Sequence, residues 1–436
     1  MKKTLLATLV IAVTSMSAAA FDLDGADRYK SAAELGIMEG LVVDADKQVN
    51  KDNAFQVAPY NRWAYQNMRM FYPTSDIAPA EEAINLERAI DASVKNVMVD
   101  NGKGEMRTFD QFMTETWGDG IVVIKGEKVV YEDYRNGMTK DTPHQLMSVT
   151  KSFGGLMALM AIDAGKVDAD AQITKYVPEL KGATGFDGAT VQQVLDMTNS
   201  MDFSEVYDDP TSGIRTYGAV LNFTEKLEGI DYPSSMYEYL QTLGKDTKHD
   251  HGEIFHYQTP KTDVVNWITN NVNGSTFQEG LESLWNNIGA SGETYVLLDG
   301  NGTPVAGGGL NATPDNLAKF ATMMLNDGEF NGEQVVPKAV VDTLAAGGDR
   351  DAFGNGPDAS DNMPAGEWSY RGQWWVKHTE GAEAFMAIGI HGQWIYIDRD
   401  RDVAIVKVSS APDSVTPAQE LYDLNGLDAI VKHVSK

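Results

Sequence analysis

Hydrophobic residues along this chain fall into two kinds of pattern, one typical of strands and one typical of helices. Short apolar runs rich in β-branched residues occupy 121–124 and 128–132, and four more lie at 372–376, 384–390, 393–397 and 403–408. Runs of this length bounded by turn residues predict strands. The first two are separated by Lys125-Gly126-Glu127, so they predict a β-hairpin.

Between the two groups of strands the spacing of apolar residues predicts helices. The longest candidate follows Ser148 and stops near Gly165, and a helix near the end is predicted over 418–434. Further helices are predicted at 80–97, 190–197, 262–271, 276–286 and 314–325. Residues 204–210 contain three acidic residues and a proline, and they predict an exposed acidic loop.

Strands at both ends with helices between them predict an α/β fold of the α+β type. The N- and C-terminal strands would share one antiparallel sheet flanked by helices, and the mostly helical segment would form a second lobe beside a cleft. We assign residues 105–436 to this main domain and residues 21–104 to an extension that packs against it.

The first twenty residues have the pattern of a secretory signal peptide. Lys2 and Lys3 precede an apolar run over 5–13, and small residues lead to Ala20, a cleavage site before Phe21. The run is too short to span a bilayer, so no stable membrane insertion is expected after cleavage. The sequence thus predicts export to the periplasm or the extracellular space.

Charge and cysteine content exclude several functions. With 35 basic and 63 acidic residues the formal net charge is −28, which disfavours nucleic acids and anionic membranes as partners. The acidity fits a small neutral or cationic substrate, or it simply keeps an exported protein soluble. The chain has no cysteine, so thiolate catalysis and cysteine-bound metal are excluded. Nothing in the sequence indicates an oligomeric state.

One short motif offers nucleophilic chemistry. Ser148 lies three residues before Lys151 at the start of the long apolar helix, and side chains three apart share one helix face. A serine becomes a good nucleophile when a neutral lysine takes its proton, and burial near a helix N-terminus favours the neutral amine. The spacing therefore predicts a base beside a nucleophile.

With this motif in place, the order of features from Gly120 onwards resembles the β-lactamase-related serine hydrolases. These include class C β-lactamases, penicillin-binding DD-peptidases and family VIII esterases. Within that superfamily the stretches 59–74, 255–259 and 389–393 are most similar to the 6-aminohexanoate-dimer hydrolases. The resemblance implies an acyl-enzyme mechanism without a cofactor and without a metal.

Carried over residue by residue, the resemblance assigns catalytic roles. Ser148 matches the acylated nucleophile, Lys151 the base, and Tyr257 the tyrosine that shares the proton shuttle. The family's oxyanion hole implies the backbone N–H of Ser148 and a second one on a late strand, for which we choose Ile388. The candidate substrate-binding residues are Thr259, His391 and Gly392. Tyr257 could equally be a core tyrosine, and His391 a structural residue at a strand end.

Two departures from the family bear on the substrate. The β-lactamase Tyr-x-Asn motif reads Tyr-Gln-Thr here, ending at Thr259, and the Lys-Thr-Gly motif is replaced by Ala384-Phe385-Met386. Without a cation there, a β-lactam or peptide carboxylate has no partner. We therefore expect hydrolysis of a small ester or short amide, with β-lactamase or DD-peptidase activity as the alternative.

The sequence also bears on three alternative functional classes. His249, Asp250, His251, Glu253 and His256 could gather around zinc, although their spacing is not that of a helical His-Glu-x-x-His site. The chain has no Gly-x-Ser-x-Gly, which argues against an α/β-hydrolase. A binding protein that lost catalysis would lack Ser148, Lys151 or Tyr257.

Acidic and aromatic residues near the expected cleft complete the candidates. Glu205, Asp208 and Asp209 could attract a substrate ammonium group or simply form a solvated loop. Trp374 and Trp375 are neighbours on a strand, so one should fill the core and the other should face the cleft.

Overall fold

The structure is a computed structural model, and it describes residues 23, 25–207 and 209–436. The predicted signal peptide, residues 1–20, and Asp208 lie outside the described residues. Among the helices of the described part, none combines the length and the apolar character needed to cross a membrane.

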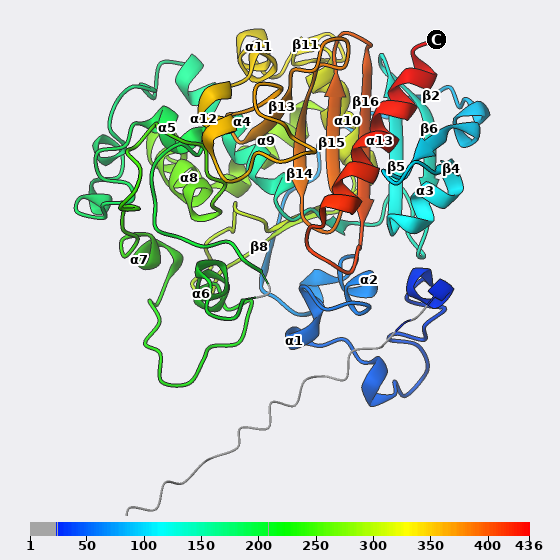
Figure 1. Cartoon of the computed structure of the whole chain (residues 1–436), viewed down its shortest axis with the longest axis horizontal. Helices are drawn as coiled ribbons and strands as arrows, with labels where there is room; N and C mark the ends of the chain where they lie inside the picture. Colours follow the sequence, from blue (N-terminus) through cyan, green and yellow to red (C-terminus); the bar gives the residue numbers. More distant parts are fainter. Residues whose placement is uncertain (1–22, 24, 208) are drawn as a thin grey trace, which may run out of the picture.

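An eight-stranded sheet forms the centre of the molecule (Figure 1). Its strand order is β12-β13-β14-β15-β16-β5-β6-β2, so the N-terminal hairpin pairs with the C-terminal strands through β16 and β5, as predicted. All pairings are antiparallel except that of β2 with β6 at one edge. The strands are β2 (Glu87–Arg88), β5 (Gly118–Lys125), β6 (Lys128–Tyr134), β12 (Trp368–Arg371), β13 (Trp374–Lys377), β14 (Ala384–Gly389), β15 (Gln393–Asp398) and β16 (Val403–Ser409).

Both faces of this sheet are covered by helices, because its strands are apolar on both sides. Alternate residues go to different cores: Val406 packs in the cluster that includes α4 and α10, and Ile405 in the cluster with α3 and α13. The helices are α3 (Phe109–Glu115), α4 (Val149–Asp163), α10 (Pro314–Leu325) and α13 (Pro417–Val434). The sheet is thus the middle of three layers.

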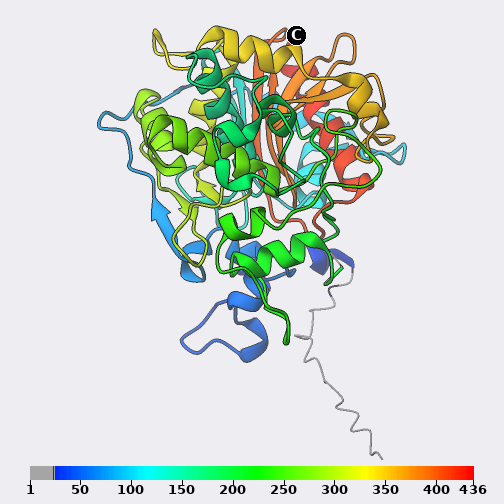
Figure 2. The ribbon, with the colours of Figure 1, turned by 90° about the vertical axis from the view of Figure 1, so that its left-hand side faces the viewer.

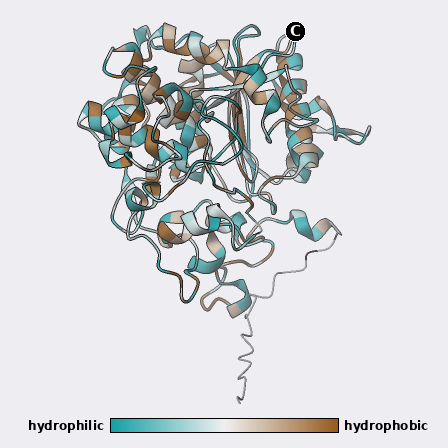
Figure 3. Cartoon of the chain, turned by 60° about the vertical axis from the view of Figure 1, so that its left-hand side comes forward, coloured by the Kyte–Doolittle hydropathy of each residue, from teal (hydrophilic) through white to brown (hydrophobic). Residues whose placement is uncertain are grey.

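The second lobe is mostly helical and lies to one side of the sheet (Figures 1 and 2). It contains α5 (Val191–Leu195), α6 (Gly213–Val220), α7 (Met236–Leu240), α8 (Pro260–Asn273) and α9 (Phe277–Asn287), followed along the chain by α11 (Lys338–Ala346) and α12 (Arg350–Asn355). Single helices carry both hydrophilic and hydrophobic residues, as helices packed on a core do (Figure 3).

The N-terminal region contributes strands as well as short helices. Its helices α1 (Lys51–Ala54) and α2 (Asn61–Ala64) precede β1 (Thr74–Asp76), which pairs with β8 (Thr294–Leu297). That small sheet continues through β9 (Leu310–Ala312) to β7 (His144–Gln145). The remaining short strands are β3 (Met98–Asp100) with β4 (Met106–Thr108), and β10 (Glu329–Phe330) with β11 (Glu333–Gln334).

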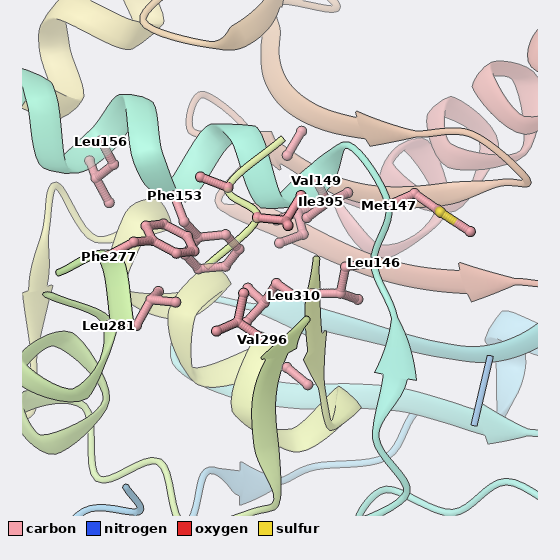
Figure 4. Packing of buried hydrophobic residues seen from close by; sticks show 14 of the residues in the cluster. Leu146, Met147, Val149, Phe153, Leu156, Phe277, Leu281, Val296, Leu310 and Ile395 are labelled. Atoms are coloured by element: carbon pink, nitrogen blue, oxygen red, sulfur yellow. The ribbon is translucent and has the colours of Figure 1, made fainter. Parts of the chain in front are cut away.

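The core beneath α4 fixes where the helix begins. Phe153 is fully buried, and its ring lies 4.4 Å from that of Phe320 and 5.6 Å from that of Trp285 (centroid to centroid). Figure 4 shows Phe153 directed toward Phe277 and Leu281 of α9. Two residues after Phe153, Gly155 lies against the backbone of Gly372, where a Cβ would come within 2.0 Å of the carbonyl oxygen.

The prediction of a helix over residues 80–97 is wrong. The segment contains β2 and a 3₁₀-helix, η4 (Ala92–Asn96), joined by irregular chain. Its backbone is bonded to other elements instead of to itself: Ala89 N donates to Val129 O and Ile84 N to Gly289 O. Pairing with the edge of the sheet therefore overrides the local helical preference.

Candidate active site

Ser148 and Lys151 lie together at the start of α4. Ser148 is the N-cap residue, and the preceding Met147 has a left-handed backbone with φ of 49°. Such a conformation in a non-glycine residue is strained and is often found at functional positions. Lys151 Nζ lies 2.8 Å from Ser148 Oγ and donates to the carbonyl oxygen of Gly307 at 2.5 Å.

The environment of Lys151 favours its neutral form. The side chain is 1% exposed, and burial lowers the pKa of Lys151 to about 8, against the opposing effect of the Glu205 and Asp263 carboxylates. About a tenth of the amine is therefore unprotonated at pH 7, far more than for an ordinary lysine, and a lysine base requires this neutral form.

Tyr257 completes a compact group with these two residues. Its hydroxyl interacts with the Ser148 side chain, and its ring centroid lies 5.1 Å from Lys151 Nζ. Burial, together with the nearby Glu205 carboxylate, raises the pKa of Tyr257 well above its ordinary value. The phenol is thus a proton donor at neutral pH and bridges toward the nucleophile.

Two buried charged residues hold the backbone around Tyr257. The amide N–H of Tyr257 donates to Asp358 Oδ2 at 2.9 Å, and Lys261 Nζ donates to the carbonyl oxygen of His256 at 2.9 Å. Burial, opposed by the Tyr257 amide, raises the pKa of Asp358 to about 6. Asp358 from outside α8 and Lys261 on the first turn of α8 thus hold the backbone that carries the phenol.

Thr259 lines the site, but its polar groups are already bonded. Its backbone N–H and its hydroxyl both donate to the Glu205 carboxylate at 2.7 Å, and the Tyr207 hydroxyl donates to the same carboxylate. Glu205 is therefore turned inward from the predicted acidic loop, whereas its neighbour Val206 is exposed.

Asp263 is a further buried carboxylate near Lys151. It is 1% exposed, and its Oδ2 accepts a hydrogen bond of 2.6 Å from the Tyr217 hydroxyl. Burial raises the pKa of Asp263 to about 7, whereas Tyr217, Lys151 and the backbone of Gly307 lower it. Gly307 contacts both Lys151 and Asp263, so one loop joins the base to this carboxylate.

His391 and Gly392 form the turn between β14 and β15, with φ of 63° and 88°. The His391 ring is 1% exposed and its Nδ1 lies 2.7 Å from the carbonyl oxygen of Ala411. Burial lowers the pKa of His391 to about 4, so the ring is neutral. The structure does not bring this ring to Ser148, whereas Gly392 lies in a pocket that includes Ser148.

Two pockets meet at Ser148. We call the first the apolar pocket, because most of the residues that line it are hydrophobic and none is acidic. It is lined by Phe55, Gln56, Met147, Ser148, Lys151, Tyr207, Ile214, Arg215, Tyr217, Gly218, Leu221, Phe223, Thr224, Thr259, Val305, Gly307, Gly308 and Ile390.

The second, the acidic pocket, extends from Ser148 toward β14 and the start of α13. Its lining includes Glu205, Asp358, Glu420 and Asp423, and none of the described residues that line it is cationic. The other residues are Val206, Tyr207, Tyr257, Ser360, Met363, Trp375, Ile388, Gly389, Ile390, Gly392, Trp394, Ser414, Val415, Thr416, Pro417 and Gln419.

As predicted, one tryptophan of β13 lies in the core and the other faces the cleft. Trp374 is fully buried, and its Nε1 donates to the carbonyl oxygen of Ser152 at 3.0 Å. Trp375 is half-buried, lines the acidic pocket and stacks on Tyr257 with ring centroids 5.5 Å apart.

The described residues contain no group of three or more His, Asp or Glu side chains placed to hold a metal ion. In the stretch considered for zinc, His251 Nδ1 accepts from the amide of Ser200 at 3.0 Å, and His249 Nδ1 lies 2.7 Å from Asp246. These ring nitrogens are used to hold the loop that leads to Tyr257.

Sequence reasoning did not single out Asp263, Asp358 or Arg215. Asp263 sits among apolar residues on α8, and a carboxylate in such a run is a signal that could have been noticed. Asp358 and Arg215 reach the site from elements distant along the chain, and no local pattern marks them.

With the geometry established, comparison with known proteins identifies the family. Residues 106–429 match the family described as Beta-lactamase, and the chain belongs to this family. It is therefore a hydrolase of the β-lactamase fold.

Two of the matches are described as 6-aminohexanoate-dimer hydrolases. The chain is 35% identical over 365 residues to a 6-aminohexanoate-dimer hydrolase of Paenarthrobacter ureafaciens, covering 84% of this chain and 89% of the relative. A solved structure from Bacillus anthracis, proposed to be a 6-aminohexanoate-dimer hydrolase, superposes with a TM-score of 0.80 at 27% identity, covering 90% and 99% of the two chains. EstCE1, a hydrolase with promiscuous acyltransferase activity, shares the fold with a TM-score of 0.55 at 16% identity over 74% and 96%.

Proposed function

We propose that the protein is an exported serine hydrolase that cleaves an ester or a short linear amide through an acyl-enzyme on Ser148. The observation that supports it most directly is the 2.8 Å separation of Lys151 Nζ from Ser148 Oγ inside a buried site. The similarity to a 6-aminohexanoate-dimer hydrolase supports a linear amide among the substrates.

In the proposed reaction neutral Lys151 takes the proton of Ser148 as Oγ attacks the substrate carbonyl carbon. The resulting ammonium passes its proton, with Tyr257 as the relay, to the departing alcohol or amine, and the acyl group stays on Ser148. Water then attacks the acyl carbon, gives a proton to the same pair, and restores the Ser148 hydroxyl.

The negative oxygen that forms in each step needs two N–H donors. We propose the backbone of Ser148 and a residue of the β14 edge, predicted as Ile388. Ile390, two residues on, directs its N–H to the same side of an extended chain. Neither Ser148 N nor Ile390 N has a hydrogen-bond acceptor within the described part of the chain. Of Ile388 on β14 and Ile390 just after the end of β14, we therefore favour Ile390.

A backbone donor can be tested by removing the N–H. Ile390→Pro should lower kcat by about 10²-fold or more, whereas Ile390→Val, which keeps the N–H, should retain most activity. The same pair of changes at Ile388 would identify the other residue if Ile390→Pro proved harmless.

The class of enzyme is tested with a fluorophosphonate probe and a substrate panel. Wild-type protein should be labelled and Ser148→Ala should not. The panel contains p-nitrophenyl esters, linear ω-amino amides, D-amino peptides and a chromogenic cephalosporin. Absence of labelling in folded protein would favour a binding protein, loss of activity with a chelator would favour a metal enzyme, and rapid cephalosporin cleavage would favour the β-lactamase alternative.

We also propose that export removes residues 1–20. The support is the sequence pattern alone, a basic start followed by an apolar run and small residues. N-terminal sequencing of protein from a bacterial host should begin at Phe21. A mature protein that begins at Met1 would contradict this proposal.

A further inference from the structure

Arg215 differs from the other arginines in that no described residue forms an ion pair, a ring contact or a hydrogen bond with its side chain. Arg62, Arg69, Arg88, Arg107, Arg135, Arg371, Arg399 and Arg401 form ion pairs, Arg28 stacks on two rings and Arg350 donates to a carbonyl oxygen. The guanidinium of Arg215 has neither an ion pair nor a hydrogen bond with any of the described residues. In a chain with 63 acidic side chains, this is unusual.

Arg215 is part of the wall of the apolar pocket. It lies on the first turn of α6, is half-buried, and lines the apolar pocket together with Ser148. The neighbouring lining is hydrophobic: Phe55 and Phe223 pack with ring centroids 5.4 Å apart, and Leu221 follows on the same helix end. None of the residues that line this pocket is acidic.

An apolar pocket with one free guanidinium recognises an apolar chain that carries an anion. Guanidinium binds carboxylate in a bidentate geometry, and the bond is strengthened where water is excluded. A single positive charge matches a monoanion, whereas a phosphate dianion would leave one charge unpaired in an apolar site. No β14 residue supplies a cation at Ala384–Met386, so this charge comes from the helical lobe instead.

We propose that Arg215 is a specificity-determining residue that binds a carboxylate on the part of the substrate occupying the apolar pocket. The substrate class is thus an ester or amide with a terminal carboxylate separated from the scissile carbonyl by a short apolar chain. This inference rests on the proposed function of Ser148 and adds to it the charge of the substrate.

The test uses two pairs of substrates matched in length. In one pair the acyl group varies, mono-p-nitrophenyl adipate against p-nitrophenyl hexanoate. In the other the leaving group varies, the hexanoyl ester of 4-hydroxyphenylacetate against that of 4-ethylphenol. The wild type should favour the anionic member by about tenfold in kcat/KM in the pair that places the carboxylate in the apolar pocket.

Variants at position 215 separate charge from structure. Arg215→Gln should remove the preference and leave the neutral ester within about twofold, Arg215→Lys should keep part of it, and Arg215→Glu should favour p-nitrophenyl 6-aminohexanoate instead. Lys181→Gln, which removes an exposed cation outside both pockets, is the control and should change nothing.

The outcomes are distinct. If the wild type prefers the carboxylate in neither pair, or if the preference survives Arg215→Gln, the inference is overturned while hydrolysis of the neutral ester still supports Ser148 catalysis. If the neutral esters are not hydrolysed and Ser148 is not labelled, the proposed function itself fails.

Discussion

The apolar pocket and the acidic pocket share Ser148, Tyr207 and Ile390, but the charged residues that line them are of opposite sign. One holds Lys151 and Arg215 and no carboxylate, and the other has four carboxylates in its wall. Ser148, the proposed nucleophile, therefore sits at a boundary between a cationic hydrophobic side and an anionic polar side. The overall charge of −28 says little about either side, since local arrangement and not the total determines which substrate groups are accepted.

The largest expected effect comes from the residues at that boundary. Ser148→Ala should lower kcat by about 10³-fold or more, and Lys151→Ala should be nearly as damaging because the two act as a unit. Steady-state hydrolysis of p-nitrophenyl butyrate measures both. If Lys151→Ala kept most of the rate, another base would have to be found on one side or the other.

Tyr257→Phe should have the next largest effect. It removes the proton relay while keeping the ring that stacks on Trp375, so kcat should fall by about 10²-fold with little change in stability. Thermal unfolding of the same variant is the control. If the variant were as active as the wild type, Tyr257 would only line the acidic pocket and would take no part in proton transfer.

Replacing the two tryptophans of β13 should separate stability from substrate binding. Trp374→Ala leaves a cavity in the core and should lower the free energy of unfolding by about 3–5 kcal/mol. Trp375→Ala opens the acidic pocket and should mainly raise KM, with a smaller loss of stability. Urea denaturation and kinetics on both variants test this, and equal effects from the two changes would be evidence against it.

The pH dependence should report the buried pair beneath the apolar pocket. Lys151 must be neutral, so kcat/KM should rise with pH and level off above about 8, where its lowered pKa lies. The ionised Asp263 raises the pKa of Lys151, so Asp263→Asn should move this limb to lower pH. This rise in kcat/KM reflects the titration of Lys151 and Asp263 together, because burial raises the pKa of Asp263 to about 7, close to that of Lys151.

Tyr217→Phe is the matched control for Asp263→Asn. It removes the 2.6 Å hydrogen bond and keeps the carboxyl group. Because that bond lowers the pKa of Asp263, its loss should leave less of the carboxylate ionised and shift the limb in the same direction by a smaller amount. An unchanged pH profile in Asp263→Asn would mean that the carboxylate does not act on Lys151.

The smallest expected effect is that of Glu420→Gln in the acidic pocket. Glu420 is half-buried and hydrogen-bonded to Asn362. We expect less than about twofold change in kcat/KM for a neutral ester, since a partly solvated charge is well screened. Comparison at low and high salt measures this screening.

Much of the fold could be predicted because the signals are local. The helix after Ser148, the hairpin around Gly126 and the C-terminal strands each have a clear period and clear ends. The segment 80–97 was mispredicted because its hydrogen bonds go to β6 and to the turn at Gly289, which local preference cannot anticipate.

The candidate site, like the fold, could be predicted from local patterns only where its residues lie close together in the sequence. Ser148 and Lys151 are one helical turn apart, so the sequence alone places them together. Asp263, Asp358 and Arg215 were not anticipated, because their positions depend on which loop or helix packs near α4. Glu205 was considered only as a substrate-attracting or solvated residue of an acidic loop, and its inward contact with Thr259 was not anticipated. In particular, the lack of an ion pair between Arg215 and any described residue follows from three-dimensional packing, which the local sequence does not reveal.

The two short strands β1 and β2 have a practical consequence for dissecting this protein. They occupy an edge of each of the two sheets, at β8 and at β6. A fragment starting at residue 105 would expose the backbone amides and carbonyls of both edges to other chains, and such edges promote aggregation. Residues 74–88 thus cover both of these edges, and fragments for expression should begin upstream of Thr74.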